Sequence, residues 1–160
     1  MILVTVGMHT DGFPRLVQEM DRIAAQVDEE VVMQIGATRN EPRAARWFTF
    51  TTQEQMEALC EQARVIVSHA GAGSILTALR YRRRLIVVPR RRHYGEVIDD
   101  HQLELAEALS SVGALLVAND ICELGAKLEE AAHFTPRVSR SNGLISAVRR
   151  AVSADANEEG

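Results

Sequence analysis

A serine–histidine pair followed by two glycines, in the stretch VIVSHAGAGSILTAL at residues 65–79, is the part of this sequence best suited to chemistry. Four apolar or small residues predict a buried strand, and the run after the glycines has the spacing of an amphipathic helix. Three roles fit such a strand-to-helix turn: a nucleophilic serine, a cradle for phosphate, or a tight turn without a ligand.

Several well-known chemistries do not fit the order of residues in this turn. A hydrolase elbow needs G-x-S-x-G, whereas the sequence reads S-H-A-G-A-G-S. The dinucleotide fingerprint lacks its third glycine, and a Walker-type G-K-[ST] is missing. The five histidines are scattered without metal-ligand spacing, so no metal is expected.

Anion binding at a helix N-terminus is the chemistry that remains. Gly71 and Gly73 allow the backbone to turn tightly and to approach a ligand without side-chain clash. A helix that starts near Ser74 would direct free N–H groups and the positive end of its dipole toward that ligand. Ser74 could cap the helix or contact a phosphate oxygen. For this loop alone, a plain glycine turn stays a competing interpretation.

Two further loops carry hydrogen-bonding groups directly after predicted strands. The first reads GMHTDG at residues 7–12, and the other runs from Arg90 to Asp100 and includes Glu96. Asp100 could simply cap the next helix, while His101 and Gln102 could bond a sugar hydroxyl or a phosphate. In an open parallel sheet such loops gather beyond the carboxyl ends of the strands, where ligands bind.

The elements that must position these loops alternate along the chain. Strands are predicted at 2–6, 31–35, 46–50, 65–68, 85–89 and 114–118, and helices at 13–27, 53–63, 74–81, 99–112, 121–132 and 142–152. All-apolar strands between helices predict an α/β fold: a Rossmann-like, open, mainly parallel sheet with helices on both faces. We expect a single domain over residues 1–153 and a disordered tail over 154–160.

Composition limits the classes of partner. The chain is 46% hydrophobic and 25% charged, with a net charge of −4 that gives no electrostatic case for wrapping nucleic acid. Seven arginines fall within residues 80–92, either as a solvated face or as a site for an anionic partner. Two distant cysteines indicate a reducing compartment. The start MILVTVG predicts a strand, not a signal peptide, so we expect a cytoplasmic protein whose membrane contact is peripheral.

Four segments together resemble a known family: VTVGMHTDGFPRLV, QIGATRNEP, VSHAGAGSILTAL and VVPRRRHYGEVIDDHQLELAEAL. They are similar to the glycosyltransferase family 28 C-terminal domain, in order and without large gaps up to about residue 130. The nearest subgroup is the small stand-alone Alg13-like type, with its bacterial PssE and EpsE counterparts, related to the C-terminal half of MurG. The segments S-H-A-G-A-G-S and D-D-H-Q-L-E-L-A are the most specific.

The resemblance implies the donor half of a GT-B enzyme, which binds a UDP-sugar and transfers it with inversion and without a metal or other cofactor. The expected partners are a membrane-anchored Alg14-like or PssD-like subunit and, through it, a lipid-linked acceptor. His9 would be a candidate base, unless the base lies in the partner. Gly7 would border the diphosphate or the sugar, and the rest of the donor would meet Ser68, His69, Gly71, Ala72, Gly73, Ser74, Arg90, Glu96, Asp100, His101 and Gln102.

Three departures from the family pattern matter. Met8 stands where a threonine is usual, Thr77 stands where relatives carry an acidic ribose ligand, and Arg82–Arg84 replace a Gly-Lys-Pro turn. The chain could therefore be a catalytic subunit, a non-catalytic accessory that binds nucleotide-sugar, or a self-sufficient homodimer. The arginines at 82–84 could face the partner or anionic lipid.

Overall fold

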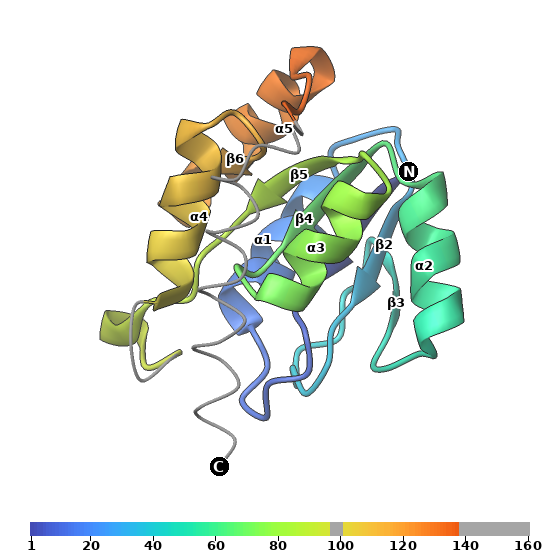
Figure 1. Ribbon diagram of the computed structural model, residues 1–160. Coiled ribbons are helices and arrows are strands. Elements are labelled where there is room, and N and C mark those ends of the chain that lie inside the picture. Colours follow the sequence, from blue (N-terminus) through green and yellow to red (C-terminus); the bar gives the residue numbers. More distant parts are fainter. Residues whose placement is uncertain (97–100, 138–160) are drawn as a thin grey trace.

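The computed structural model describes residues 1–96 and 101–137, and for residues 101 and 102 only the backbone. It is an α/β fold, as predicted (Figure 1). The strands are β1 (Ile2–Thr5), β2 (Val31–Gln34), β3 (Arg46–Phe48), β4 (Val65–Ser68), β5 (Arg84–Val87) and β6 (Leu116–Val117). The helices are α1 (Pro14–Ala24), α2 (Gln53–Gln62), α3 (Ala72–Arg80), α4 (His101–Ser111) and α5 (Leu124–His133), with 3-10 turns at Arg92–Tyr94 and Ile121–Glu123.

The six strands form one parallel sheet in the order β3-β2-β1-β4-β5-β6. The chain winds outward from β1 in one direction and from β4 in the other, so the order reverses between these two central strands. Thr5 at the end of β1 pairs with Ser68 at the end of β4. Ligands of such sheets bind beyond the carboxyl ends of the strands at this switch point.

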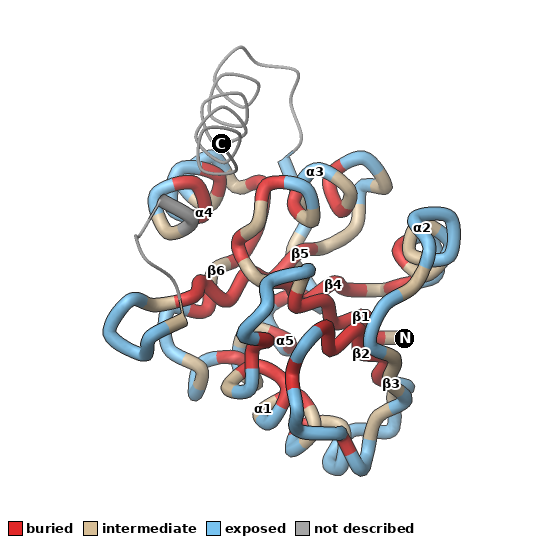
Figure 2. The backbone as a smooth tube through the Cα atoms, turned by 90° about the horizontal axis from the view of Figure 1, so that it is seen from below, coloured by how far each residue is buried: buried red, intermediate tan, exposed pale blue. Residues whose placement is uncertain are grey.

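Two hydrophobic cores lie on opposite faces of the sheet, because successive strand residues point to opposite sides. Ile2 and Val4 of β1 pack with α1 and α5, whereas Leu3 packs with α2, α3 and α4. The buried strands therefore form the middle layer between two layers of helices (Figure 2). A fully buried run such as ILVT is stable there because both of its faces are covered.

The ends of several helices follow local rules. Pro14 occupies the start of α1, where its missing N–H costs nothing, and the Thr52 hydroxyl caps α2 by accepting from the Gln55 amide. Helix α3 begins at Ala72, two residues before the predicted start, and its N-cap is Gly71. Ser74 is therefore inside the first turn and is not the cap. The helix predicted at 142–152 and the tail at 154–160 lie outside the described residues.

Candidate functional site

Two adjoining cavities lie at the switch point of the sheet. One of about 360 Å³ is lined by the β4–α3 turn, and the other, of about 370 Å³, is lined by the start of α2 and the loop before it. They share six lining residues, so they form one continuous hollow: Thr5, Gly7, Met8, Met56, Ser74 and Thr77. We call the first the cradle cavity and the second the α2 cavity.

The His69 imidazole separates the loops after β1 and β4. A Cβ atom added to Gly7 would lie 2.5 Å from His69 Cε1, and one added to Gly71 would lie 2.9 Å from Cδ2 and closer still to Nε2. Gly7 also has a φ of +76°, which favours glycine by itself. Both glycines are thus required for the ring to fit, a role that the sequence pattern did not reveal.

The His69 ring is uncharged at neutral pH. Burial and, to a smaller extent, the positive charge of Arg90 together lower its pKa to about 4. Nδ1 lies 3.5 Å from the Thr5 carbonyl oxygen, which favours a proton on Nδ1 and leaves Nε2 as an acceptor beside Gly71. A base with so low a pKa is poorly suited to taking a proton from an acceptor hydroxyl.

The first turn of α3 presents free amides to the cradle cavity. The first backbone bond of the helix runs from the Ile75 N–H to the Gly71 carbonyl, and no side chain caps the helix. The N–H groups of Ala72, Gly73 and Ser74 precede that bond and lie at the positive end of the helix dipole. Gly73 has no atom within 4 Å of the place where its Cβ would stand. A ligand can therefore approach this backbone closely.

Ser68 lies behind the turn. Its side chain is fully buried, and its hydroxyl donates to the His69 carbonyl at 2.8 Å. It lines neither of the two cavities. The structure therefore gives Ser68 a part in shaping the turn, whereas the sequence predicted contact with the donor.

Arg90 also turns inward, away from the cleft in which the sequence placed it. Its guanidinium donates to the carbonyls of Val6 and Gly12, lies 4.5 Å from the centre of the Phe13 ring, and is 1% exposed. Burial lowers its pKa, but an arginine remains charged. Arg90 thus anchors the β1–α1 loop through hydrogen bonds to its backbone carbonyls. It does not line the cradle cavity, so it would act on a ligand there by long-range electrostatic attraction and not by direct contact.

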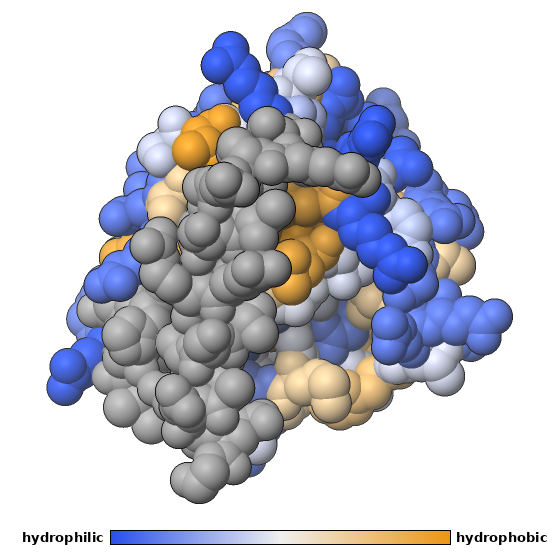
Figure 3. Space-filling view, viewed as in Figure 1, coloured by the Kyte–Doolittle hydropathy of each residue, from blue (hydrophilic) through white to orange (hydrophobic). Residues whose placement is uncertain are grey.

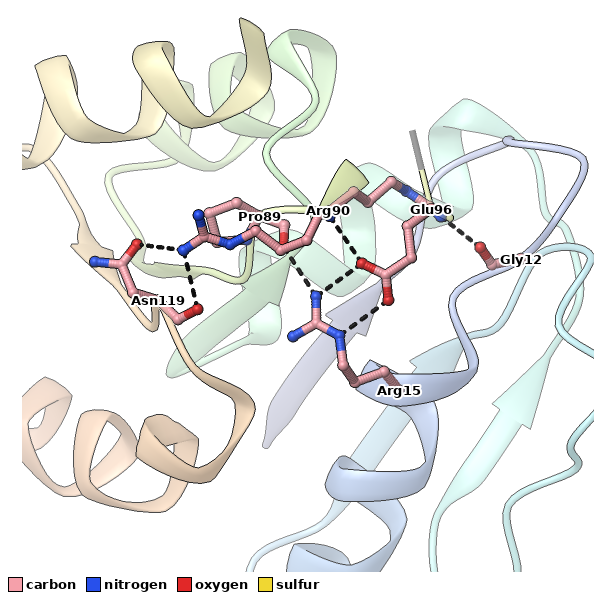
Figure 4. A network of polar contacts seen from close by, with 7 residues as sticks. Gly12, Arg15, Pro89, Arg90, Glu96 and Asn119 are labelled. Carbon is pink, nitrogen blue, oxygen red and sulfur yellow. Dashed lines mark hydrogen bonds and ion pairs between the residues drawn. The ribbon is translucent and has the colours of Figure 1, made fainter. Parts of the chain in front are cut away.

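Glu96 takes part in an ion pair that joins the loop after β5 to the start of α1 (Figure 4). Arg15 at the start of α1 donates to both Glu96 carboxylate oxygens at 2.9 Å and to the Pro89 carbonyl at 3.0 Å. The Arg91 amide also donates to Glu96, and the Arg91 side chain donates to Asn119. The carboxylate predicted to meet the sugar is therefore already held by Arg15.

Of the other predicted site residues, six line the cradle cavity, one lies outside both cavities, and the side chains of three lie outside the described residues. Gly7, His69, Gly71, Ala72, Gly73 and Ser74 line the cradle cavity, as a shared site requires. His9 is exposed on the β1–α1 loop and lines neither cavity, and its Nδ1 accepts from the Asp11 amide at 3.3 Å. Asp100 and the side chains of His101 and Gln102 lie outside the described residues.

Sequence reasoning missed the residue that anchors the β1–α1 loop. Gln34, at the end of β2 and 4% exposed, accepts from the Thr5 hydroxyl and from the amides of Val6 and Gly7. Its own amide group donates to the carbonyls of Gly7 and Thr49. A glutamine at the end of an otherwise apolar strand, VVMQ, was the available signal.

The arginine-rich segment does not form one face. Arg80 and the residues up to Arg84 lie around the turn into β5, whereas Arg90 and its two successors follow the strand at its other end. The Arg84 side chain donates to the Phe134 carbonyl. On the face seen in Figure 3, apolar patches interrupt a mostly hydrophilic surface. The partner or lipid contact predicted for residues 82–84 stays a prediction.

Two classes of feature are missing from the part of the chain that the structure describes. Residues 1–96 and 101–137 contain no group of three or more His, Cys, Asp or Glu side chains that could hold a metal ion. Over the same residues, no helix is long and apolar enough to cross a membrane.

Comparisons with known proteins match most of the chain to one family. The family model described as "Glycosyltransferase family 28 C-terminal domain" matches residues 1–143. The UDP-N-acetylglucosamine transferase subunit ALG13 of Eremothecium gossypii is 32% identical over 141 residues, covering 78% of this chain and 68% of its own. The subunit of the same name from Cryptococcus neoformans is 46% identical over 65 residues, covering 39% of this chain and 30% of its own.

Solved structures show the same fold. An NMR structure of ALG13 has a TM-score of 0.61 at 20% identity and covers 88% of this chain and 90% of its own. The glycotransferase of kitacinnamycin has a TM-score of 0.63 at 22% identity and covers 99% of this chain and 42% of its own. The chain therefore spans less than half the length of this enzyme and of the Cryptococcus relative.

Proposed function

Because this chain belongs to the glycosyltransferase family 28 C-terminal domain family, we propose that it is the donor-binding part of a UDP-sugar glycosyltransferase. The observation that carries the proposal is the N-terminus of α3, which no side chain caps and whose first residues, Ala72, Gly73 and Ser74, line the cradle cavity. A diphosphate bears the charge that these amides and the helix dipole favour. The absence of side-chain atoms at Gly73 leaves room for it.

In the proposed reaction, an acceptor hydroxyl attacks the anomeric carbon of the sugar as the bond to the diphosphate breaks. The leaving UDP takes the bonding electrons, so negative charge grows on its terminal phosphate. Fixed amides at Ala72, Gly73 and Ser74 would stabilise this charge without reorganisation, and the buried Arg90 would add a positive field from behind. Attack from the face opposite the leaving group inverts the anomeric centre. With the charge countered in this way, we expect no metal requirement.

The acceptor proton requires a base. His9 is the candidate on this chain, because it is exposed on a loop of the switch point, while the ring of His69 is held neutral with a pKa of about 4. The relatives are named as transferase subunits, which supports a second chain in the complete enzyme. We infer that this partner is a membrane-anchored Alg14-like or PssD-like subunit, that it binds a lipid-linked saccharide, and that it brings this chain to the cytoplasmic face of the membrane.

A second candidate function is a non-catalytic module that binds the nucleotide-sugar for its partner. One observation favours it: His9 lines neither cavity, and His69, the one histidine among the described residues that line the hollow, is held neutral with a pKa of about 4. The two functions differ when the partner is expressed alone. Transfer by the partner without this chain would favour the accessory module, and transfer only by both chains together would favour the catalytic subunit.

The test of donor binding is calorimetric titration of the full chain with UDP, UDP-N-acetylglucosamine, UDP-glucose, UDP-galactose and UDP-glucuronate. Thymidine diphosphate serves as a comparison, since a structural neighbour, SsfS6, is described in complex with it. We expect at least one UDP compound to bind. A failure of all of them at millimolar concentration, with and without the partner, would overturn the proposal.

A further inference from the structure

The α2 cavity contains a carboxylate that has no part in the proposed diphosphate site. Its far wall is formed by the loop after β3 and the first turns of α2: Phe50, Thr51, Thr52, Gln53, Met56 and Glu57. Among the described residues that line either cavity, Glu57 is the one acidic side chain. Because the two cavities share six lining residues, a ligand whose diphosphate occupies the cradle cavity can reach Glu57.

Neighbouring donors hold the Glu57 carboxylate in place. The Tyr81 hydroxyl donates to Oε2 at 2.8 Å, and the Gln53 amide donates to Oε1 at 2.9 Å from one turn earlier on the same helix. Arg80 adds a longer ion pair at 3.7 Å. A carboxylate can accept about four hydrogen bonds. One close bond to each oxygen leaves acceptor positions for a ligand, on a side chain that is already oriented.

The chemistry of this wall selects the part of a ligand that it can contact. A carboxylate repels phosphate but accepts strongly from hydroxyl groups, and two oxygens suit a pair of adjacent hydroxyls. Phe50, which is 54% exposed, and Met56 provide apolar surface beside it, as a flat nucleobase requires. Thr77 also lines this cavity, but its hydroxyl donates to the Gly73 carbonyl within α3 and it carries no charge.

We propose that Glu57 binds the 2′ and 3′ hydroxyls of the donor's ribose and so makes the site selective for a ribonucleoside diphosphate over a deoxyribonucleoside diphosphate. The inference rests on the proposed function, since it requires the diphosphate to occupy the cradle cavity. It assigns the base to the apolar wall beside Phe50. It also assigns the selectivity for ribose to a residue of helix α2, which lies outside the glycine-containing segment at the start of α3.

The test compares UDP with 2′,3′-dideoxyuridine diphosphate on the full chain, by calorimetry, for the native protein and for Glu57→Gln. The glutamine keeps the size of the side chain and one oxygen but removes the charge. A hydrogen bond to a charged group is worth more than one to a neutral group, so Glu57→Gln should weaken UDP binding about fivefold to tenfold. Binding of the dideoxy compound should not change. Glu61→Gln, an exposed position one turn later on the same helix, is the matched control and should leave both affinities unchanged.

The outcomes separate the two proposals. If native protein binds neither UDP nor any UDP-sugar, the donor-site proposal fails and takes this inference with it. If UDP and the dideoxy compound bind equally, and Glu57→Gln changes neither, the donor site stands and the role of Glu57 is refuted. If Glu57→Gln weakens a UDP-sugar but not UDP, the carboxylate contacts the transferred sugar, which also contradicts the proposed ribose contact.

Discussion

The two glycines of the β4–α3 turn should respond to alanine substitution in opposite ways. At Gly71 a Cβ atom would lie 2.9 Å from His69 Cδ2 and closer to Nε2, so the ring or the turn has to move. Forcing an extra carbon into a packed site costs roughly 1–3 kcal/mol, and the lower entropy of the unfolded chain returns roughly 0.4–1 kcal/mol. We therefore expect Gly71→Ala to lower the free energy of unfolding by about 1–2 kcal/mol.

Gly73→Ala is the matched control, because a Cβ atom there meets nothing within 4 Å and the backbone is already helical. Its stability should stay equal or rise by up to about 1 kcal/mol. Its affinity for a UDP-sugar should fall about tenfold, however, since the new methyl group occupies the space at the α3 N-terminus that the diphosphate needs. Urea denaturation and calorimetric titration measure the two effects. A Gly71→Ala protein as stable as the native one would refute the packing role of His69.

Three further predictions concern charge. Glu29 accepts from Arg64 and the N-terminal ammonium, and the hydrogen bond from Arg64 does most to lower its pKa from 4.5 to about 2. The free energy of unfolding should therefore be retained above pH 4.5 and fall by about 1–2 kcal/mol as the pH drops toward 2. Glu29→Gln should reduce this loss in urea titrations. The ring of His69 should titrate near pH 4 by NMR, and an NMR titration midpoint above pH 6 would contradict its burial. Because the ring of the unfolded chain binds a proton near pH 6.5, this group lowers the free energy of unfolding as the pH falls from 6.5 to 4. Arg15→Ala should cost about 1–3 kcal/mol by breaking the half-buried pair with Glu96. Arg22→Ala breaks the exposed pair with Glu19 on the same helix and should cost clearly less. Equal losses in urea denaturation would contradict the difference in burial.

The sequence predicted the fold well, and it predicted which loops gather at one edge of the sheet, because both depend on local patterns. Alternating strands and helices predicted the parallel sheet, and glycine and polar residues after the strands predicted the edge at which the loops meet. Strand ends were less accurate: β6 covers Leu116–Val117, whereas residues 114–118 were predicted. Pairing with a neighbouring strand, not propensity alone, decides where such a short edge strand ends.

The roles of individual charged side chains were harder to predict, because they depend on partners far away in the chain. Arg15 and Glu96 are 81 positions apart, and Arg90 reaches the Val6 carbonyl across 84 positions. The local sequence does not distinguish an arginine that contacts phosphate from one that donates hydrogen bonds to the backbone carbonyls of a loop. Glu57 was missed for the same reason, since only the packing of α2 beside α3 brings it to the hollow.

The central claim is that a donor diphosphate binds at the N-terminus of α3, and backbone NMR tests it most directly. The full chain, labelled with ¹⁵N, is titrated with UDP while the amide signals are followed. We expect the largest shifts at Ala72, Gly73 and Ser74, with smaller shifts at Gly7 and in the first turn of α2. Saturable binding that leaves these amides unshifted, or no binding at millimolar UDP even with the partner subunit present, would contradict it.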